Sequence, residues 1–189
     1  MRALSSVGAD VRLSSDPREA LSADALVVPG VGAFAACMAS LTSIGADDTI
    51  RQAVAAQMPI LAICVGHQIL FSHGVEQGIE AEGVGIFPGV IEKLPTTRLP
   101  HMGWNDVAPD PDSRFFHQRH RYYFVHSYAA LTVTDIPVDA RGIWAEHDGT
   151  RFLAAVEHGS VLSTQFHPEK SGQAGLSLLR RWVDTLGES

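Results

Sequence analysis

The sequence feature that most constrains the fold is an unbroken apolar run, Pro-Ile-Leu-Ala-Ile at residues 59–63, which ends directly at Cys64. A strand that is apolar at every position is buried on both faces of its sheet, as in parallel α/β proteins. The first half of the chain alternates short apolar runs with stretches of helical spacing. This pattern predicts strands at 9–13 and 25–28 and helices at 33–43, 47–57 and 68–71. We therefore predict an α/β fold with a mostly parallel central sheet flanked by helices.

The second half of the chain has a different pattern, with short strand-like runs separated by tight turns. These runs lie at residues 83–91, 122–130, 141–146, 152–157 and 160–165. They predict an antiparallel extension of the sheet, closed by an amphipathic helix over 172–186. Residues 93–120 are Pro-rich and polar, so we expect an irregular loop that serves function or faces a partner.

Composition excludes several classes of protein. A length of 189 residues with 46% hydrophobic content fits a single domain over 1–189. The net charge of −7 argues against a nucleic-acid partner. Two cysteines without a C-x-x-C pair indicate neither a disulfide framework nor a zinc site, and they fit a cytoplasmic protein. Because no apolar run approaches about 18 residues and no signal peptide is recognisable, we expect no membrane association.

Cys64 is the first candidate for chemistry, because an apolar strand ends at it and turns through Gly66 into a helix-like segment. This is the outline of a nucleophile elbow. A helix start lowers the pKa of a thiol, and the next backbone N–H can bind an oxyanion. The alternative is an inert buried cysteine at a strand end, which is common. Cys37, in an Ala-rich helical stretch, is interpreted as a packing residue.

His167 and Glu169 are the second candidate, at the end of the last predicted strand. Residues two apart lie on the same side of an extended chain, and Pro168 disfavours helix at the preceding residue. His167 could act as the general base of a thiol nucleophile, with Glu169 orienting its imidazole. An ordinary surface pair is the alternative for this segment alone, but its combination with Cys64 favours catalysis.

The glycines of Pro29-Gly30-Val31-Gly32 follow a buried strand, so the backbone there can direct N–H groups toward a ligand. An ordinary strand-to-helix turn is equally compatible with this spacing. The segment lacks the G-x-G-x-x-G pattern of a dinucleotide site and the lysine of a P-loop, so neither cofactor is predicted.

Five segments together resemble the class I, triad-type glutamine amidotransferases, and among them the glutaminase subunits of imidazole glycerol phosphate synthase. They are VVPGVGAF, ICVGHQILF, PHMGWN, YYFVHSYAA and QFHPEKSGQAGLSLLR. The cysteine elbow and His-Pro-Glu identify the class, whereas PHMGWN and HPEKSG are typical of these glutaminase subunits. The resemblance covers about residues 1–187.

The resemblance implies that Cys64 attacks the side-chain amide of glutamine, that His167 transfers protons and that Glu169 orients His167. Backbone N–H groups of Val65 and, after a rearrangement of the loop, Val31 would hold the oxyanion, with Gly30 and Gly32 permitting that rearrangement. The implied substrate contacts are Gln68, His126, Ser127 and Tyr128. No metal or organic cofactor is implied.

The resemblance also implies a partner, a (β/α)₈ cyclase subunit that receives the ammonia and forms a heterodimer with this chain. The cyclase would make imidazole glycerol phosphate and an aminoimidazole carboxamide ribotide for histidine biosynthesis. The expected partner-facing loop comprises His101, Met102, Trp104 and Asn105, with Lys170 as a further contact. An exposed aromatic among polar residues suits an interface, although structural packing of Trp104 is an alternative.

Two features depart from the family pattern. Ala62 stands where relatives have glycine, so its methyl group could crowd the elbow. The family's first strand and its following loop have no counterpart before Arg2, and we expect a natural start about 15 to 25 residues upstream. Two alternatives therefore stay open, a non-catalytic remnant and the subunit of another class I amidotransferase.

Overall fold

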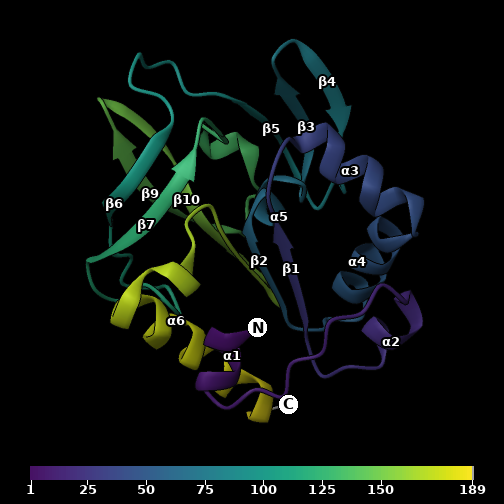
Figure 1. The fold of residues 1–189 in the computed structure, drawn as a ribbon. Coiled ribbons are helices and arrows are strands. Elements are labelled where there is room, and N and C mark those ends of the chain that lie inside the picture. Colours follow the sequence, from purple (N-terminus) through teal and green to yellow (C-terminus); the bar gives the residue numbers. More distant parts are fainter. Residues whose placement is uncertain (189) are drawn as a thin grey trace.

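The computed structural model describes residues 1–188, which form two β-sheets surrounded by helices (Figure 1). The larger sheet consists of β1 (Leu26–Gly30), β2 (Ile60–Cys64), β6 (His101–Val107), β7 (His120–His126), β9 (Arg141–His147), β10 (Thr150–His158) and β11 (Val161–Thr164). The smaller sheet consists of β3 (Phe71–Glu76), β4 (Ile79–Glu82), β5 (Phe87–Lys93) and β8 (Tyr128–Ala129). The strand orders are β1-β2-β11-β10-β9-β6-β7 and β4-β3-β5-β8.

Helices cover both faces of the parallel part of the larger sheet. They are α1 (Arg2–Ser6), α2 (Pro17–Leu21), α3 (Phe34–Ser43), α4 (Ala46–Ala55), α5 (Val65–Gln68) and α6 (Gly172–Asp184), with short 3₁₀ turns at Val133–Asp135, Pro168–Lys170 and Thr185–Glu188. Figure 1 shows α3 and α4 to one side of β1 and β2, and α6 with α1 to the other. Within residues 1–188, no helix combines the length and apolarity needed to cross a membrane.

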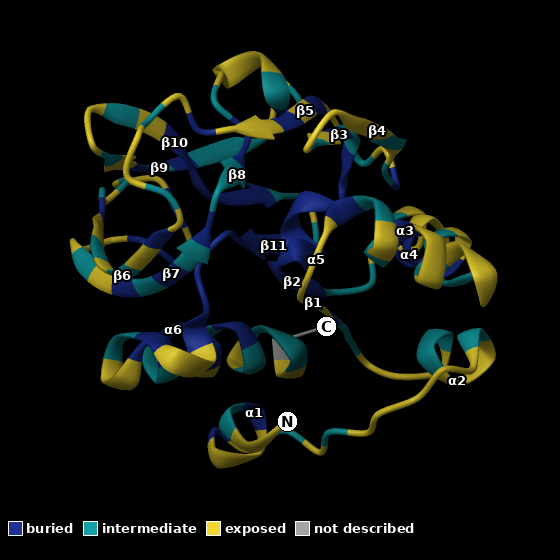
Figure 2. Cartoon of the chain, turned by 45° about the horizontal axis from the view of Figure 1, so that its top comes forward, coloured by how far each residue is buried: buried dark blue, intermediate teal, exposed yellow. Residues whose placement is uncertain are grey.

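Strand β2 is the centre of the parallel core, as its unbroken apolar run predicts. It pairs in parallel with β1 on one side and β11 on the other, and all five of its residues are buried (Figure 2). Ala62 is fully buried and keeps regular register with Val28 and Ser163. The extra methyl group at this position is therefore accommodated without a break in the sheet.

The predicted antiparallel extension is also present. β10 runs antiparallel to both β9 and β11, and β6 runs antiparallel to both β7 and β9. Its core is aromatic, because Tyr122, Phe124, Phe152 and Phe166 pack ring against ring. The α/β prediction with helices and an antiparallel extension is confirmed, and the sheet is mixed, with more antiparallel than parallel pairs.

Two predicted elements are wrong in the first half of the chain. Residues 9–13 form no strand, because no strand lies beside them and a lone extended segment leaves its N–H and C=O groups unpaired. The helix after Cys64 ends at Gln68, and Phe71 instead begins the β3–β4 hairpin. Gln77 and Gly78 form its turn, both with positive φ, which matches the requirement of a two-residue hairpin loop.

Two predictions also fail between residues 83 and 120. Only the end of the run at 83–91 is a strand, β5, and the supposedly irregular region contains β6. The apolar residues Met102 and Trp104 are on the exposed face of β6, whereas polar residues face inward, so the usual pattern of a half-buried strand is inverted. Pairing along its whole length with β7 decides its conformation, and this pairing is long-range.

The ends of β1 and α5 approach each other so closely that only glycine fits. A Cβ at Gly66 would lie 1.9 Å from the carbonyl oxygen of Val28, and a Cβ at Gly30 would lie 2.4 Å from the amide nitrogen of Gly66. Both contacts are with backbone atoms, which cannot move aside as a flexible side chain can. The two glycines therefore set the distance between the loop after β1 and the cysteine elbow.

We expect Gly66→Ala to lower the free energy of unfolding by about 3 kcal/mol, because the added methyl group overpacks a backbone contact. Gly187→Ala is the matched control, since a Cβ there meets no atom within 4 Å. It should change the free energy by less than about 0.5 kcal/mol. Urea denaturation of both variants measures the difference, and equal stability would contradict the contact.

Candidate active site

Cys64 occupies a strained turn between β2 and α5. Its φ of 56° and ψ of −114° are rarely adopted by residues other than glycine. Such strain persists only where the surrounding structure enforces it, and it is concentrated at functional sites. Because α5 has only four residues, the predicted helix-dipole effect on the thiol is small. The first-turn N–H of Val65 remains as a donor beside the sulfur.

The Cys64 side chain is buried between two possible proton acceptors. Its Sγ lies 3.9 Å from the carbonyl oxygen of Val125 on β7. It also interacts with the His167 imidazole, strongly enough to be the largest influence on the pKa of that histidine. The structure thus brings together the cysteine and histidine that lie about a hundred residues apart in the sequence.

His167 and Glu169 are in direct contact, with 2.8 Å between Nδ1 and Oε1. His167 has extended φ and ψ angles, and Pro168 then begins the 3₁₀ turn Pro168–Lys170. The predicted contact is present, although a turn and not a continuous extended chain brings the two side chains together. Glu169 lies at the rim, with 36% of its side chain exposed, whereas His167 is buried.

Hydrogen bonds keep His167 in its protonated form. Interaction with Cys64 first, and with Glu169 second, raises the pKa of His167 to about 9, although burial opposes the rise. Burial is the largest influence on Glu169 and tends to raise its pKa, but the hydrogen bonds from His167 and the backbone, with the charges of His167 and Lys170, together lower it. The imidazolium is therefore the main form at neutral pH. The stabilisation it brings is complete below about pH 6.5 and is lost as the pH rises through about 9.

Ser171 positions the histidine. Its hydroxyl donates to the carbonyl oxygen of His167 at 2.6 Å and accepts from the amide of Tyr123 at 2.9 Å. The amide of His167 donates in turn to the carbonyl oxygen of Tyr123. Ser171 directly precedes α6, but its hydroxyl makes no cap hydrogen bond to that helix. Sequence reasoning missed this clamp, because its partner is on a distant strand.

The loop of Gly30, Val31 and Gly32 lies against the elbow through the close contact of Gly30 and Gly66. Val31 is 82% exposed, so its side chain does not fix the loop. The amide of Phe34, at the start of α3, donates to the Glu76 carboxylate at 2.8 Å. Glu76, from β3, therefore anchors the far end of the loop, and no sequence motif marks it.

The predicted substrate residues divide into two groups. Gln68 donates from Nε2 to the carbonyl oxygen of Tyr128 at 2.9 Å, and so joins the elbow helix to β8, with Ser127 next in the chain. His126 is buried, and both its ring nitrogens are already occupied by His101 and by the Tyr128 carbonyl. The His126 ring is therefore already engaged within the protein, and a substrate contact by the strand 126–128 stays a prediction.

The predicted partner-facing loop is the strand β6, so its side chains alternate between two faces. Met102 and Trp104 are exposed, at 60% and 48%, and Lys170 is exposed nearby. His101 is buried and Asn105 is half-buried, on the opposite face. Met102 and Trp104 are therefore the residues of this strand that are open to a partner, and an interface role for His101 stays a prediction.

The arrangement can perform acyl transfer through a thiol. A buried cysteine in a strained turn, a protonated histidine against it and an adjacent backbone N–H are the parts that such chemistry requires. Within the described chain, residues 1–188, no three His, Cys, Asp or Glu side chains are grouped to hold a metal ion.

The family model for class I glutamine amidotransferases matches residues 1–185. The chain belongs to this family. It is 55% identical to the imidazole glycerol phosphate synthase subunit HisH of Nocardia farcinica, over 98% of this chain and 90% of that protein. It is 52% identical to the HisH subunit of Cutibacterium acnes, over 98% of this chain and 89% of that protein.

Solved structures of amidotransferases share the fold. One crystal structure of a glutamine amidotransferase superposes with a TM-score of 0.75 at 18% identity, over 98% of this chain and 91% of that one. A glutamine amidotransferase from Thermotoga maritima gives a TM-score of 0.60 at 16% identity, over 87% of this chain and 79% of that one. At such identities the likeness concerns the fold alone, and it confirms the class I amidotransferase architecture.

We expect NMR titration of His167 to give a pKa of about 9. Glu169→Gln should lower this pKa, and Cys64→Ala should lower it further, since the interaction with Cys64 is the larger cause. Glu92→Gln, an exposed carboxylate replaced on β5, is the control and should leave it unchanged. Titration of the wild-type His167 near the ordinary value of 6.5 would contradict this account of the site.

Proposed function

We propose that this amidotransferase chain hydrolyses glutamine to glutamate and ammonia through Cys64, His167 and Glu169, and serves as the glutaminase subunit of an imidazole glycerol phosphate synthase. The observation that carries the proposal is the meeting of a strained, buried cysteine with a histidine whose pKa is raised to about 9. The identity of 55% to a HisH subunit supports this choice among class I amidotransferases.

The chemistry follows from the protonation state of the site. The Cys64 thiolate attacks the side-chain carbonyl carbon of glutamine, and the N–H of Val65 stabilises the oxyanion. The His167 imidazolium donates its proton to the amide nitrogen, and the C–N bond breaks to release ammonia and leave a thioester. Neutral His167 then takes a proton from water, which attacks the thioester. The C–S bond then breaks, glutamate leaves, and the Cys64 thiolate and the His167 imidazolium are restored; Glu169 orients the imidazole through both steps.

A second oxyanion donor is proposed in Val31, once the loop after β1 rearranges. Gly32, with φ of 93°, flanks it, and the exposed Val31 side chain makes no packing contact that would have to be broken. The ends of the loop are held by Gly30 at the elbow and by Glu76 at α3. A mobile middle between fixed ends suits a donor that turns inward when glutamine binds.

The proposed partner is a (β/α)₈ cyclase, which would use the ammonia to make imidazole glycerol phosphate and an aminoimidazole carboxamide ribotide for histidine biosynthesis. Met102 and Trp104 support a docking face, because exposed apolar and aromatic side chains on one strand face are typical of interfaces. Trp104 also lies edge-on to Tyr123, whose backbone holds His167. We place the activity in the cytoplasm, where reducing conditions keep a catalytic thiol free.

Replacement of Cys64 by Ala tests the function in the reconstituted complex with the cyclase. Synthesis from glutamine should fall by at least about 10³-fold, because no nucleophile remains, whereas synthesis from added ammonia should persist. Cys37→Ala, which removes the other thiol, is the matched control and should retain both activities.

Three results would contradict the proposal. Equal loss of both activities in Cys64→Ala would argue against a separate glutaminase step. Co-purification with a different synthase, and no cyclase, would favour another class I amidotransferase. Failure of a glutamine-mimicking electrophile to label Cys64 in the wild-type complex would indicate a non-catalytic remnant.

A further inference from the structure

A chain of side-chain hydrogen bonds runs from strand β6 to the substrate side of the elbow. Asn105 Nδ2 lies 3.2 Å from His101 Nε2, and His101 Nδ1 lies 2.8 Å from His126 Nε2. His126 Nδ1 lies 3.0 Å from the carbonyl oxygen of Tyr128, which also accepts from Gln68 at 2.9 Å. Three strands and the elbow helix thus share one continuous connection.

The direction of every bond in this chain is fixed by its two ends. A carbonyl oxygen only accepts, so His126 donates from Nδ1 to Tyr128 and must accept at Nε2. His101 therefore donates from Nδ1 and accepts at Nε2, where Asn105 is the donor. The amide of Asn105 is held in this orientation, because its Nδ2 also donates to the carbonyl oxygen of Glu146 and its Oδ1 accepts from a backbone amide.

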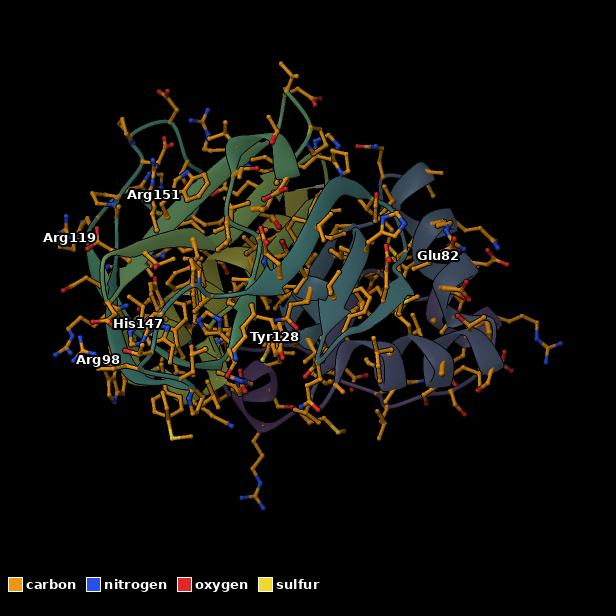
Figure 3. The ribbon with its side chains drawn as sticks, turned by 90° about the horizontal axis from the view of Figure 1, so that it is seen from above. Glu82, Arg98, Arg119, Tyr128, His147 and Arg151 are labelled. Atoms are coloured by element: carbon orange, nitrogen blue, oxygen red, sulfur yellow. The ribbon has the colours of Figure 1, made fainter. Side chains whose placement is uncertain are left out.

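The two histidines of this hydrogen-bond chain are buried and uncharged. Burial lowers the pKa of His126 to about 3, and burial followed by the charge of His147 lowers that of His101 to about 4. The His147 ring stacks on His101 at 4.1 Å, but its Nε2 donates to the carbonyl oxygen of Arg98, outside the chain. Figure 3 shows His147 beside Arg98 at one side of the molecule, with Tyr128 near its middle.

The first members of the hydrogen-bond chain, Asn105 and His101, lie behind the proposed docking face. Strand alternation puts Met102 and Trp104 on the outer face of β6, and His101 and Asn105 on the inner face. His101 and His126 are directly opposite each other in the β6–β7 register. A shift of β6 under pressure from a partner would therefore be passed to the Tyr128 carbonyl and to Gln68.

We propose that His101 and His126, with Asn105, are positioning residues that hold the Tyr128 carbonyl and Gln68 in register with the partner-facing strand β6. The inference rests on the proposed glutaminase function. The ring nitrogens of both histidines are engaged within the protein, so each acts through the backbone of residue 128. Through this hydrogen-bond chain, a bound cyclase would lower the KM of the site for glutamine.

The experiment compares His101→Phe with His147→Phe in the full complex with the cyclase. Both variants keep an aromatic ring in the same stack, but only the first breaks the hydrogen-bond chain. His101→Phe should raise the KM for glutamine and reduce stimulation by the cyclase, each by about tenfold, because the site is displaced. His147→Phe should stay within about threefold of wild type on both measures, and both should keep synthesis from ammonia.

Asn105→Leu is the second variant, should His101→Phe not fold, and it should change both measures in the same direction. The proposal would be overturned if His101→Phe kept the wild-type KM for glutamine and the wild-type stimulation by the cyclase. It would also be overturned if both Phe variants lost these properties equally, because the effect would then come from ring stacking alone.

An activity-independent measurement separates this proposal from the proposed function. ¹⁵N NMR of the wild-type chain should show both His101 and His126 as Nδ1–H tautomers. Nε2–H tautomers would overturn the hydrogen-bond chain even in an active enzyme. A wild-type complex without glutaminase activity would refute the proposed function. The NMR result would still decide whether the hydrogen-bond chain is present.

Discussion

The site depends on the backbone contact between the end of β1 and the start of α5. The space between the Val28 carbonyl and Gly66 admits no side chain, so the start of α5 packs directly on the backbone of β1. This contact places the loop after β1 against the turn that carries Cys64. The strained backbone of Cys64 lies between buried chain neighbours, Ile63 and Val65, and such strain persists only where the surrounding structure enforces it.

The other half of the site comes from the antiparallel part of the same sheet. Antiparallel pairing supplies Tyr123, and the Ser171 hydroxyl joins this strand to the carbonyl oxygen of His167. The parallel half therefore positions the nucleophile, and the antiparallel half positions the base. The raised pKa of His167 is a consequence of their meeting, since neither half alone brings the thiol to the imidazole.

Local features of this site could be predicted from the sequence, and long-range ones could not. The elbow at Cys64 and the pair His167 and Glu169 are visible because each is contained in a few adjacent residues. Strand β6 escaped prediction because its conformation depends on β7, about twenty residues later. Residues 9–13 were misread for the opposite reason, since their apolar pattern suits a strand but they have no neighbour to pair with.

Strand pairing decides which of the histidines lie inside the protein and which lie at its surface. No metal-ligand spacing in the sequence marks His147, so a surface position is expected. His101 is expected in the partner-facing loop. Once β6 pairs with β7, His101 faces His126 inside the sheet, and burial makes both neutral. The same alternation sends Met102 and Trp104 outward. One short motif therefore presents an apolar face to solvent and a hydrogen-bonded face to the active site, and a strand is the only regular element that separates adjacent residues in this way.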